Sequence, residues 1–254
     1  MKIYLCDKSK LNLDAHYERV LEGLEAAGRE SVLRFRQQED RHRALVREIL
    51  LRRILHEVFP GRRIQIDENE YGRPFVAGMW QADGSPIGGK DYAGFDFNIS
   101  HSGDLIIIAF GERCAFNAGT STNVCNGAGL FSEGPLGIDV ERLGRAGDYK
   151  KILRFFSQEE QDLIGSSDHP ERDFYRVWTC REAFSKLEGT GLSLFDKEPV
   201  HINYKEKNVI YHGKIYCFHE FAYPGYQITL CAGQKLAVPR PVLMGEEIFL
   251  NVIS

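Results

Sequence analysis

The sequence predicts an α+β fold, which would consist of two similar lobes if the chain contains an internal duplication. Short apolar runs with strand spacing alternate with two long amphipathic helical patterns, which is typical of this class. The two halves also resemble each other. IIIAFG at 106–111 is similar to ITLCAG at 228–233, and the helical stretch REILLR at 47–52 is similar to REAFSK at 181–186. Such short matches favour an internal duplication only weakly, but a duplicated chain would place its ligand site between the lobes.

The first half reads as two helices and several strands. The longest pattern has Leu45, Ile49, Ile54 and Val58 at helical spacing. We expect strands at 1–6, 63–67, 95–100 and 105–110, a turn at 71–74, and helices at 12–27 and 39–59, with Gly28 ending the first helix. In the strand at 95–100, apolar and polar residues alternate, as in a strand buried on one face.

The second half begins after a compositional break. Residues 117–134 are rich in Gly, Asn, Ser and Thr, so we interpret them as a loop or linker between an N-terminal lobe at 1–116 and a C-terminal lobe at 135–254. Helices are expected at 148–156, 158–164 and 170–187, and strands at 201–204, 209–212, 216–221 and 226–232.

The net charge, the apolar runs and the cysteine pattern of the chain argue against several classes of protein. The 254 residues carry a formal net charge of -4, which argues against bulk binding to nucleic acid or to an anionic membrane. The longest aliphatic run, 105–110, is too short to span a bilayer, and the N-terminus has no pattern of a signal peptide. The six cysteines show no C-x-x-C pair, so we expect them to be reduced. A cytoplasmic protein is the expectation.

Two carboxylates interrupt an apolar strand in the segment LGIDVE at 136–141. Asp139 and Glu141 lie two residues apart, so their side chains project from the same face of the strand. Two anions this close repel each other, and a divalent cation with oxygen ligands would resolve the conflict. The alternative is a solvated strand face on which the acids pair with Arg142 or Arg145.

A second block lies in the helix at 170–187. Trp178, Glu182 and Lys186 recur every four residues and therefore share one helical face. Glu182 could be a metal ligand or a general base, and Lys186 could hold a phosphate oxygen. The alternative is a surface ion pair, which explains neither the tryptophan nor the GTGLS turn at 189–193.

A third block, FNISHSG at 97–103, ends the strand at 95–100. His101 lies where the strand turns, at a place from which a side chain can reach a cleft. The alternative is a structural histidine without a ligand.

Taken together and in this order, FNISHSG, GIDVE and WTCREAFSK resemble the 4′-phosphopantetheinyl transferases of the surfactin-synthetase-activating type. The resemblance extends to MKIY at 1–4, EDRHR at 39–43, YGRP at 71–74 and GLS at 191–193. It implies a pseudo-twofold pair of similar lobes, each a small, mainly antiparallel sheet packed with a long helix. The reaction implied is transfer of 4′-phosphopantetheine from coenzyme A to a serine of an apo acyl or peptidyl carrier protein, with release of adenosine 3′,5′-bisphosphate.

The resemblance also implies roles for individual residues. It makes Asp139, Glu141 and Glu182 the ligands of Mg²⁺, with Mn²⁺ as an alternative metal. It also makes Glu182, Lys186 and Asp139 catalytic, Glu182 being the base for the carrier serine. Coenzyme A, as substrate, would be bound by the residues Arg43, Arg73, Ser100, His101 and Lys186. The implied partners are an apo carrier domain and coenzyme A, without nucleic acid or membrane, and the chain is expected to be a monomer.

The chain departs from the family pattern at the end of the first helix. Lysines that often grip the 3′-phosphate there correspond to Gly28 and Ser31 in this sequence. Neighbouring arginines could replace them, because a guanidinium binds a phosphate with two donors. These are Arg29, Arg34, Arg41 and Arg43.

Two other functions remain as alternatives. A non-catalytic module that binds coenzyme A or a carrier would keep the fold without the chemistry, although all three acids and Lys186 are present. A Mg²⁺-dependent nuclease would need a basic surface, and its Glu and Lys would alternate along a strand instead of having helical spacing.

Overall fold

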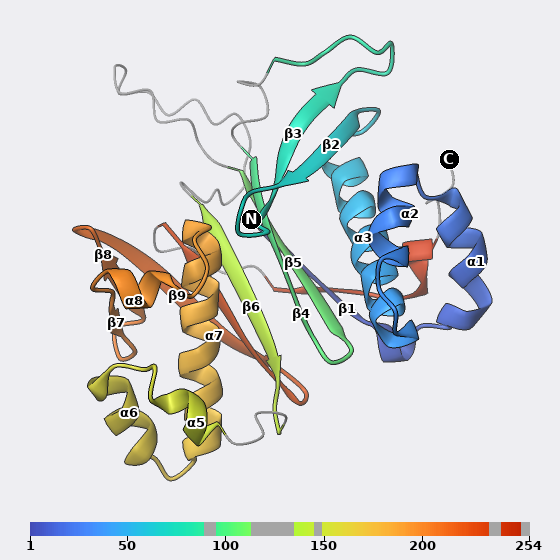
Figure 1. Cartoon of the computed structure of the whole chain (residues 1–254). Coiled ribbons are helices and arrows are strands. Elements are labelled where there is room, and N and C mark those ends of the chain that lie inside the picture. The colour runs from blue at the N-terminus through green and yellow to red at the C-terminus, as the bar shows by residue number, and fades with distance from the viewer. Residues whose placement is uncertain (89–94, 113–134, 145–148, 234–239, 250–254) are drawn as a thin grey trace.

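The computed structural model describes residues 1–88, 95–112, 135–144, 149–233 and 240–249. Its two main sheets pack face to face, with a long helix on each outer side, as Figure 1 shows. This α+β arrangement of two sheets and flanking helices is the predicted fold class.

The first sheet has the strand order β11–β1–β5–β4. Its strands are β1 (Lys2–Asp7), β4 (Phe95–Ser102), β5 (Leu105–Glu112) and β11 (Val242–Met244). The helices α1 (Leu13–Gly23), α2 (Ala26–Leu33) and α3 (Gln38–Val58) cover its outer face, and a separate hairpin is formed by β2 (Arg63–Glu68) and β3 (Pro74–Trp80). Two short 3₁₀ helices, η1 (Lys8–Lys10) and η2 (Glu246–Phe249), complete this part.

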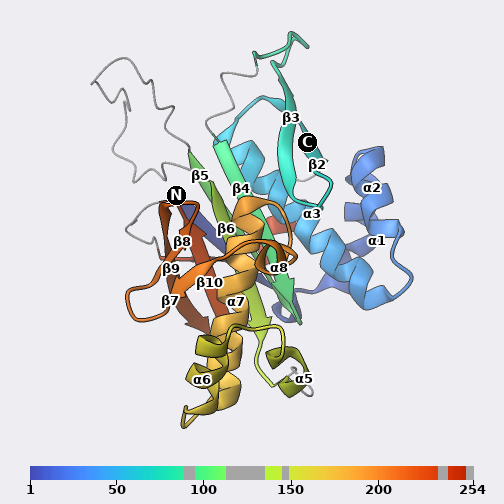
Figure 2. The same ribbon diagram turned by 60° about the vertical axis from the view of Figure 1, so that its left-hand side comes forward.

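The second sheet has the strand order β6–β10–β9–β8–β7. Its strands are β6 (Leu136–Arg142), β7 (His201–Asn203), β8 (Asn208–Tyr211), β9 (Lys214–Tyr223) and β10 (Tyr226–Ala232). The helix α7 (Pro170–Glu188) lies on its outer face, accompanied by α5 (Lys150–Leu153), α6 (Gln158–Gly165) and α8 (Leu194–Lys197). In Figure 2, α3 and α7 flank the sheets from opposite sides.

Three strands of each sheet are connected in the same way. In the first sheet β1 pairs antiparallel with β5, and β5 with β4; in the second, β6 pairs antiparallel with β10, and β10 with β9. The long helix follows the first strand of each set, α3 after β1 and α7 after β6. The two sequence pairs that resemble each other, β5 with β10 and α3 with α7, therefore occupy equivalent positions.

Both faces of the central strands are buried. Along β1, Ile3 and Leu5 face the second sheet, while Tyr4 and Cys6 face the helices of the first lobe. Burial on both sides explains why strands such as β5 read as continuous apolar runs instead of alternating ones. The apolar area removed from water between the sheets is the main stabilising contribution at the lobe junction.

The polar residues of β4 line the junction between the lobes instead of facing solvent. Backbone N–H groups on the free edge of β6 donate to side chains of β4 at every second position. The pairs are Leu136 with Asp96 at 2.9 Å, Ile138 with Asn98 at 2.9 Å, Val140 with Ser100 at 3.2 Å and Arg142 with Ser102 at 3.0 Å. This ladder satisfies the buried edge of β6 and sets its register against β4.

Several boundaries differ from the expectation. Gly28 lies inside α2 and does not end a helix, because the chain already turns between α1 and α2. The segment after the turn at 71–74 continues as β3, which pairs with β2. The expected loop at 117–134 lies outside the described residues.

The segment at 240–249 returns to the first sheet after the second sheet is complete. Val242–Met244 pairs parallel with β1, and Ile248 and Phe249 pack into the core around α3. Burial of these apolar side chains ties the segment to the N-terminal sheet although it follows the second lobe in sequence.

Among the described residues, no disulfide joins the cysteines Cys6, Cys180, Cys217 and Cys231. In the same part of the chain, we find no helix with the length and apolar character that crossing a membrane requires.

Candidate active site

Asp139 lies at the centre of the lobe junction. The residue is 3% exposed, and its Oδ1 accepts hydrogen bonds from Ser100 Oγ at 2.8 Å and from Lys186 Nζ at 2.6 Å. Lys186 Nζ also donates to Ser100 Oγ at 3.0 Å. The second oxygen, Oδ2, is buried without a hydrogen-bond partner. A buried carboxylate oxygen without a donor is costly, so this atom marks a place for a cation.

Glu141 lies on the same face of β6, as its spacing from Asp139 predicts. Its Oε2 accepts from Ser102 Oγ at 2.7 Å and its Oε1 from Trp178 Nε1 at 3.3 Å. Burial is the main cause of a raised pKa for Glu141, and the negative charge of Asp139 adds to it. Ser100 and Ser102 of β4 thus each donate a hydrogen bond to one of the two carboxylates of β6.

The helix α7 presents Glu182 and Lys186 to these acids from consecutive turns. Burial, followed by the charge of Asp139, raises the pKa of Glu182 to about 7. Burial lowers the pKa of Lys186, but the charges of Asp139 and Glu182 outweigh it, so the net pKa is raised and the ammonium is retained.

A glycine on β6 allows α7 to come this close. A Cβ atom on Gly137 would lie 2.1 Å from the Ala183 carbonyl oxygen and 2.5 Å from the Leu187 backbone nitrogen. Only a residue without a side chain fits between these backbone atoms. Gly137 therefore allows the short distance between β6, which carries Asp139 and Glu141, and α7, which carries Glu182.

The donor set fits a hard divalent cation. Asp139, Glu141 and Glu182 offer only oxygen ligands, which Mg²⁺ prefers, and Asp139 raises the pKa of both glutamates. The unpartnered Oδ2 of Asp139 supplies an independent structural sign of such a site. The described part of the chain contains no ready-made cage of three or more His, Cys, Asp or Glu side chains. The acids are thus a charged cluster and not a preassembled coordination shell.

His101 lies on the face of β4 opposite to Ser100 and turns toward α3. It lines a small hollow of about 40 Å³ with Arg43, Arg47, Asp40, Phe35 and Ala44. Desolvation, followed by the charges of Arg43, Lys186 and Arg47, lowers the pKa of His101 to about 4. Arg43 donates to the Gly103 carbonyl at 3.2 Å and pairs with Asp40 at 2.7 Å.

Arg73 takes a different position from the other expected coenzyme A contacts. Its guanidinium pairs with Asp96 at 2.6 Å and donates to the carbonyls of Leu136, Lys186 and Leu187. These contacts join the first lobe to β6 and to the end of α7. In this structure the donors of Arg73 are turned toward protein groups, and its role toward coenzyme A stays a prediction.

Gly28 and Ser31 stand where the family often has lysines, and nearby arginines were expected to replace those lysines. These arginines differ in whether their guanidinium groups already contact protein atoms. Arg29 donates to the carbonyls of Glu22 and Leu24, and Arg41 donates to that of Phe35. Arg34 lies over the ring of Phe35.

Sequence reasoning overlooked three residues at this site and one contact of a fourth. Ser102 and Asn98 look like ordinary polar residues of a half-buried strand, and Arg47 looks like any polar residue on a helix. Their positions follow only from the packing of β4 against β6 and of α3 against β4. Trp178 was noticed as an aromatic flank, but its hydrogen bond to Glu141 is a tertiary contact.

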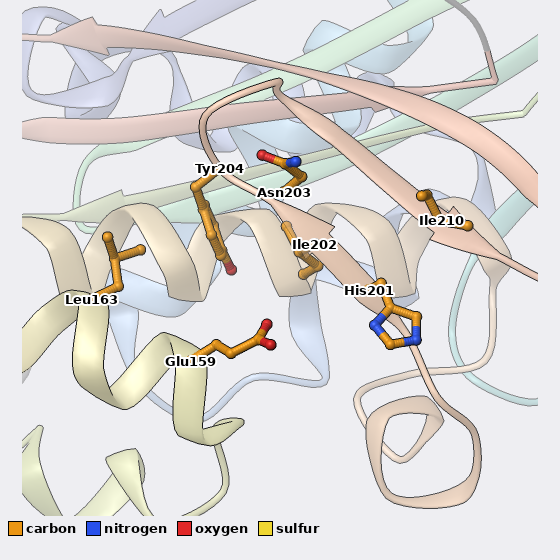
Figure 3. Close-up of a pocket in the computed structure, with 7 residues that line it drawn as sticks. All are labelled: Glu159, Leu163, His201, Ile202, Asn203, Tyr204 and Ile210. Atoms are coloured by element: carbon orange, nitrogen blue, oxygen red, sulfur yellow. The ribbon is translucent and has the colours of Figure 1, made fainter.

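A larger hollow of about 430 Å³ lies elsewhere, between α6 and the strands β7 and β8 (Figure 3). It is lined by Glu159, Leu163, His201, Ile202, Asn203, Tyr204 and Ile210. None of the expected site residues belongs to it.

Comparison with known proteins agrees with the two-lobed architecture. The profile described as 4′-phosphopantetheinyl transferase, N-terminal, matches residues 12–113, and that of the 4′-phosphopantetheinyl transferase superfamily matches residues 135–231. The chain belongs to the 4′-phosphopantetheinyl transferase superfamily, and its similarity to the relatives ffp and Sfp supports a transferase of the Sfp type.

Three relatives illustrate the similarity. The chain is 27% identical to the 4′-phosphopantetheinyl transferase ffp of Bacillus subtilis over 92% of this chain and 93% of that protein. It is 28% identical to the 4′-phosphopantetheinyl transferase Sfp of Bacillus subtilis (strain 168), over 91% of this chain and 92% of that protein. It is 26% identical to the 4′-phosphopantetheinyl transferase gsp of Aneurinibacillus migulanus, over 80% and 73% respectively.

Proposed function

We propose that the protein transfers the 4′-phosphopantetheine group of coenzyme A to a serine hydroxyl of an apo carrier protein. The new bond joins the serine oxygen to the phosphorus that carries the pantetheine arm. The bond from that phosphorus to the bridging oxygen breaks, and adenosine 3′,5′-bisphosphate leaves. Family membership and the arrangement of the acids and Lys186 support this reaction.

The observation that carries the proposal is the meeting of Ser100, Asp139 and Lys186. They come from β4, β6 and α7, and therefore from both lobes, and they converge within hydrogen-bond distance. Displacement at phosphorus requires alignment and charge neutralisation more than covalent catalysis by the protein. Three carboxylates would hold a divalent cation here, and that cation together with the ammonium of Lys186 would neutralise a diphosphate substrate.

Each residue then has a defined task. Glu182, whose pKa is close to neutrality, accepts the proton of the carrier serine, either directly or through a water. Lys186 neutralises the charge that develops on the leaving oxygen. Asp139, Glu141 and Glu182 would hold Mg²⁺, which supplies charge neutralisation at the diphosphate when it is bound. Ser100, His101 and Arg43 would bind the phosphates of coenzyme A.

Mass measurement on the carrier tests the reaction directly. We expect an apo carrier incubated with the protein, coenzyme A and Mg²⁺ to gain the mass of the phosphopantetheine arm, and a chelator to prevent the gain. Glu182→Gln should abolish transfer while the protein stays folded. Glu159→Gln, an exposed glutamate on α6, is the matched control and should be fully active. A fully active Glu182→Gln enzyme would refute the assigned base.

The same experiment separates the alternatives. A non-catalytic module would bind coenzyme A without changing the carrier mass, and a nuclease would degrade DNA in the presence of Mg²⁺. The nuclease is disfavoured because Glu182 and Lys186 lie on a helix and the net charge is -4. A panel of apo carriers from fatty-acid, polyketide and peptide synthesis would identify the partner. The monomeric state, the cytoplasmic location and the lobe boundaries at 116 and 135 are parts of the same proposal.

A further inference from the structure

The hollow beside His101 has an excess of positive groups. Two guanidinium groups, those of Arg43 and Arg47, line it together with the imidazole, while Asp40 is its one carboxylate. Asp40 is already paired with Arg43 at 2.7 Å. No carboxylate that lines the hollow therefore remains to compensate the positive charge of Arg47.

Arg47 has no protein partner among the described residues. Its guanidinium makes no hydrogen bond, ion pair or ring contact there, whereas other arginines nearby are engaged: Arg29, Arg41, Arg43 and Arg52. The side chain is only partly exposed, because Arg47 lies on α3 where the helix packs against the first sheet. Holding an unpaired charge in a partly buried place has a cost that a bound anion would offset.

The location of the hollow matches the chemistry of the proposed substrate. Ser100 faces the acid cluster and His101 the α3 side, because neighbouring residues of a strand point in opposite directions. A ligand bound around the end of β4 thus meets Lys186 and the acid cluster, which would accept an anionic group through a bound cation, on one side, and the cationic hollow on the other. Coenzyme A has two such groups, the diphosphate and the 3′-phosphate of its ribose.

The helix α2 does not contribute a cation to this hollow. Gly28 has no side chain, and Ser31 Oγ donates to the Gly28 carbonyl at 2.8 Å. The cationic groups come from α3 instead, on successive turns at Arg43 and Arg47, where two side chains four residues apart share one face.

We propose that Arg47 binds the 3′-phosphate of coenzyme A, with Arg43 and His101, and thereby makes the enzyme select coenzyme A over 3′-dephospho-coenzyme A. The inference rests on the proposed function and adds a specificity-determining residue to it. A guanidinium suits this task because it binds phosphate with two parallel charge-assisted hydrogen bonds.

Steady-state kinetics with both substrates tests the assignment. We expect the wild-type enzyme to favour coenzyme A, and Arg47→Gln to lower kcat/KM for coenzyme A by roughly 10- to 100-fold, mainly through KM. The same variant should change the constants for dephospho-coenzyme A by less than about twofold, because that substrate lacks the group that Arg47 binds. Arg47→Lys should recover part of the preference, since an ammonium keeps the charge but not the paired donors.

Arg52→Gln is the matched control. Arg52 lies on the same helix but pairs with Glu48 at 2.9 Å, so its replacement should leave the preference for coenzyme A unchanged. An Arg47→Gln enzyme that keeps the wild-type preference, or that loses activity equally with both substrates, would overturn the assignment.

Binding measured without a carrier separates this inference from the proposed reaction. We expect adenosine 3′,5′-bisphosphate to bind the wild-type protein at least about tenfold more tightly than adenosine 5′-monophosphate in calorimetry, and Arg47→Gln to remove the difference. If this preference depends on Arg47 while the carrier gains no mass, the inference stands and the proposed function fails. If transfer occurs but the wild-type protein shows no preference, the inference fails and the function stands.

Discussion

Lys186 Nζ lies 2.6 Å from Asp139 Oδ1, and this ion pair connects the helix α7 to the strand β6 at the junction of the lobes. Ser100 of the other lobe touches both partners, with its oxygen 2.8 Å from Asp139 Oδ1 and 3.0 Å from Lys186 Nζ. The same lysine that is proposed to neutralise the leaving group therefore also compensates a buried carboxylate.

The pair predicts a stability effect at Lys186. Lys186→Met leaves Asp139 buried without its cation, so the free energy of unfolding should fall by about 3 kcal/mol in the presence of a chelator. Urea unfolding measures this, and Mg²⁺ should restore part of the loss. Lys2→Met is the matched control, because Lys2 pairs with Glu57 on the exposed surface, where a pair contributes about 1 kcal/mol or less. Equal losses for the two variants would contradict the role assigned to the pair.

Glu182 predicts how stability depends on pH in the metal-free protein. Its pKa rises from 4.5 to about 7 in the folded state, so the folded protein binds this proton more tightly than the unfolded chain. The free energy of unfolding should therefore fall as pH rises from about 4.5 to about 7, and stay low above that. At about 1.4 kcal/mol per pKa unit, the change in the free energy of unfolding is on the order of 3 kcal/mol.

Urea midpoints between pH 5 and pH 8 in a chelator check this dependence. Glu182→Gln should flatten the curve in this window and be more stable than the wild type at pH 8. Parallel curves for the wild type and Glu182→Gln would show that the carboxylate does not have the raised pKa.

The hydrogen bond from Ser102 to Glu141 leads to a prediction about the Mg²⁺ affinity of the proposed metal site. Its hydroxyl donates to Glu141 Oε2 at 2.7 Å and orients that carboxylate. Ser102→Ala should raise the Mg²⁺ concentration for half-maximal transfer roughly tenfold, because groups that orient metal ligands contribute to metal affinity. Ser102→Thr keeps the hydroxyl and should behave more like the wild type.

Ser85→Ala controls for the loss of a serine–carboxylate hydrogen bond in general. Ser85 Oγ donates to Asp83 Oδ1 at 2.6 Å on an exposed turn, so its replacement should leave the Mg²⁺ dependence unchanged. If Ser102→Ala has the same Mg²⁺ dependence as Ser85→Ala, Ser102 does not position Glu141.

The close approach of β6 and α7 at Gly137 leads to a prediction about a substitution that adds one methyl group there. Gly137→Ala would place a Cβ atom against the backbone of Ala183 and Leu187, neither of which can move without shifting α7. We expect a loss of about 3 kcal/mol or more in the free energy of unfolding and a loss of transfer, because overpacking against backbone cannot be relieved by a side-chain rotation. Thermal unfolding measures the first effect.

Gly165→Ala is the matched control for this prediction. The position lies at the end of α6 with nothing within 4 Å of an added Cβ atom, so alanine should be neutral or slightly stabilising there. A Gly137→Ala protein as stable as the wild type would show that α7 does not press on β6 as described.

Much of the fold was predictable because its signals are local. The helical spacing of Leu45, Ile49 and Ile54 predicted α3, which spans Gln38–Val58, and Pro170 preceded the predicted helix that became α7. The spacing of Asp139 and Glu141 likewise predicted that both side chains leave β6 on one face. Periodicity of this kind reflects the geometry of the backbone over a few residues.

The sequence by itself determined the two long helices, most strands and the residue types of the acid cluster. The tertiary structure alone decided which residues these elements contact. Asn98 looked like a polar residue on a solvated strand face, yet it accepts a hydrogen bond from Ile138, forty residues away, in a buried junction. Arg47 looked like any solvated helix residue until α3 was packed beside β4, and the last strand, Val242–Met244, could be assigned to the first lobe only through its pairing with β1. Local patterns fix which way a side chain leaves its own element, but the atoms it meets depend on how distant segments pack, and that is set by burial and strand register over the whole chain.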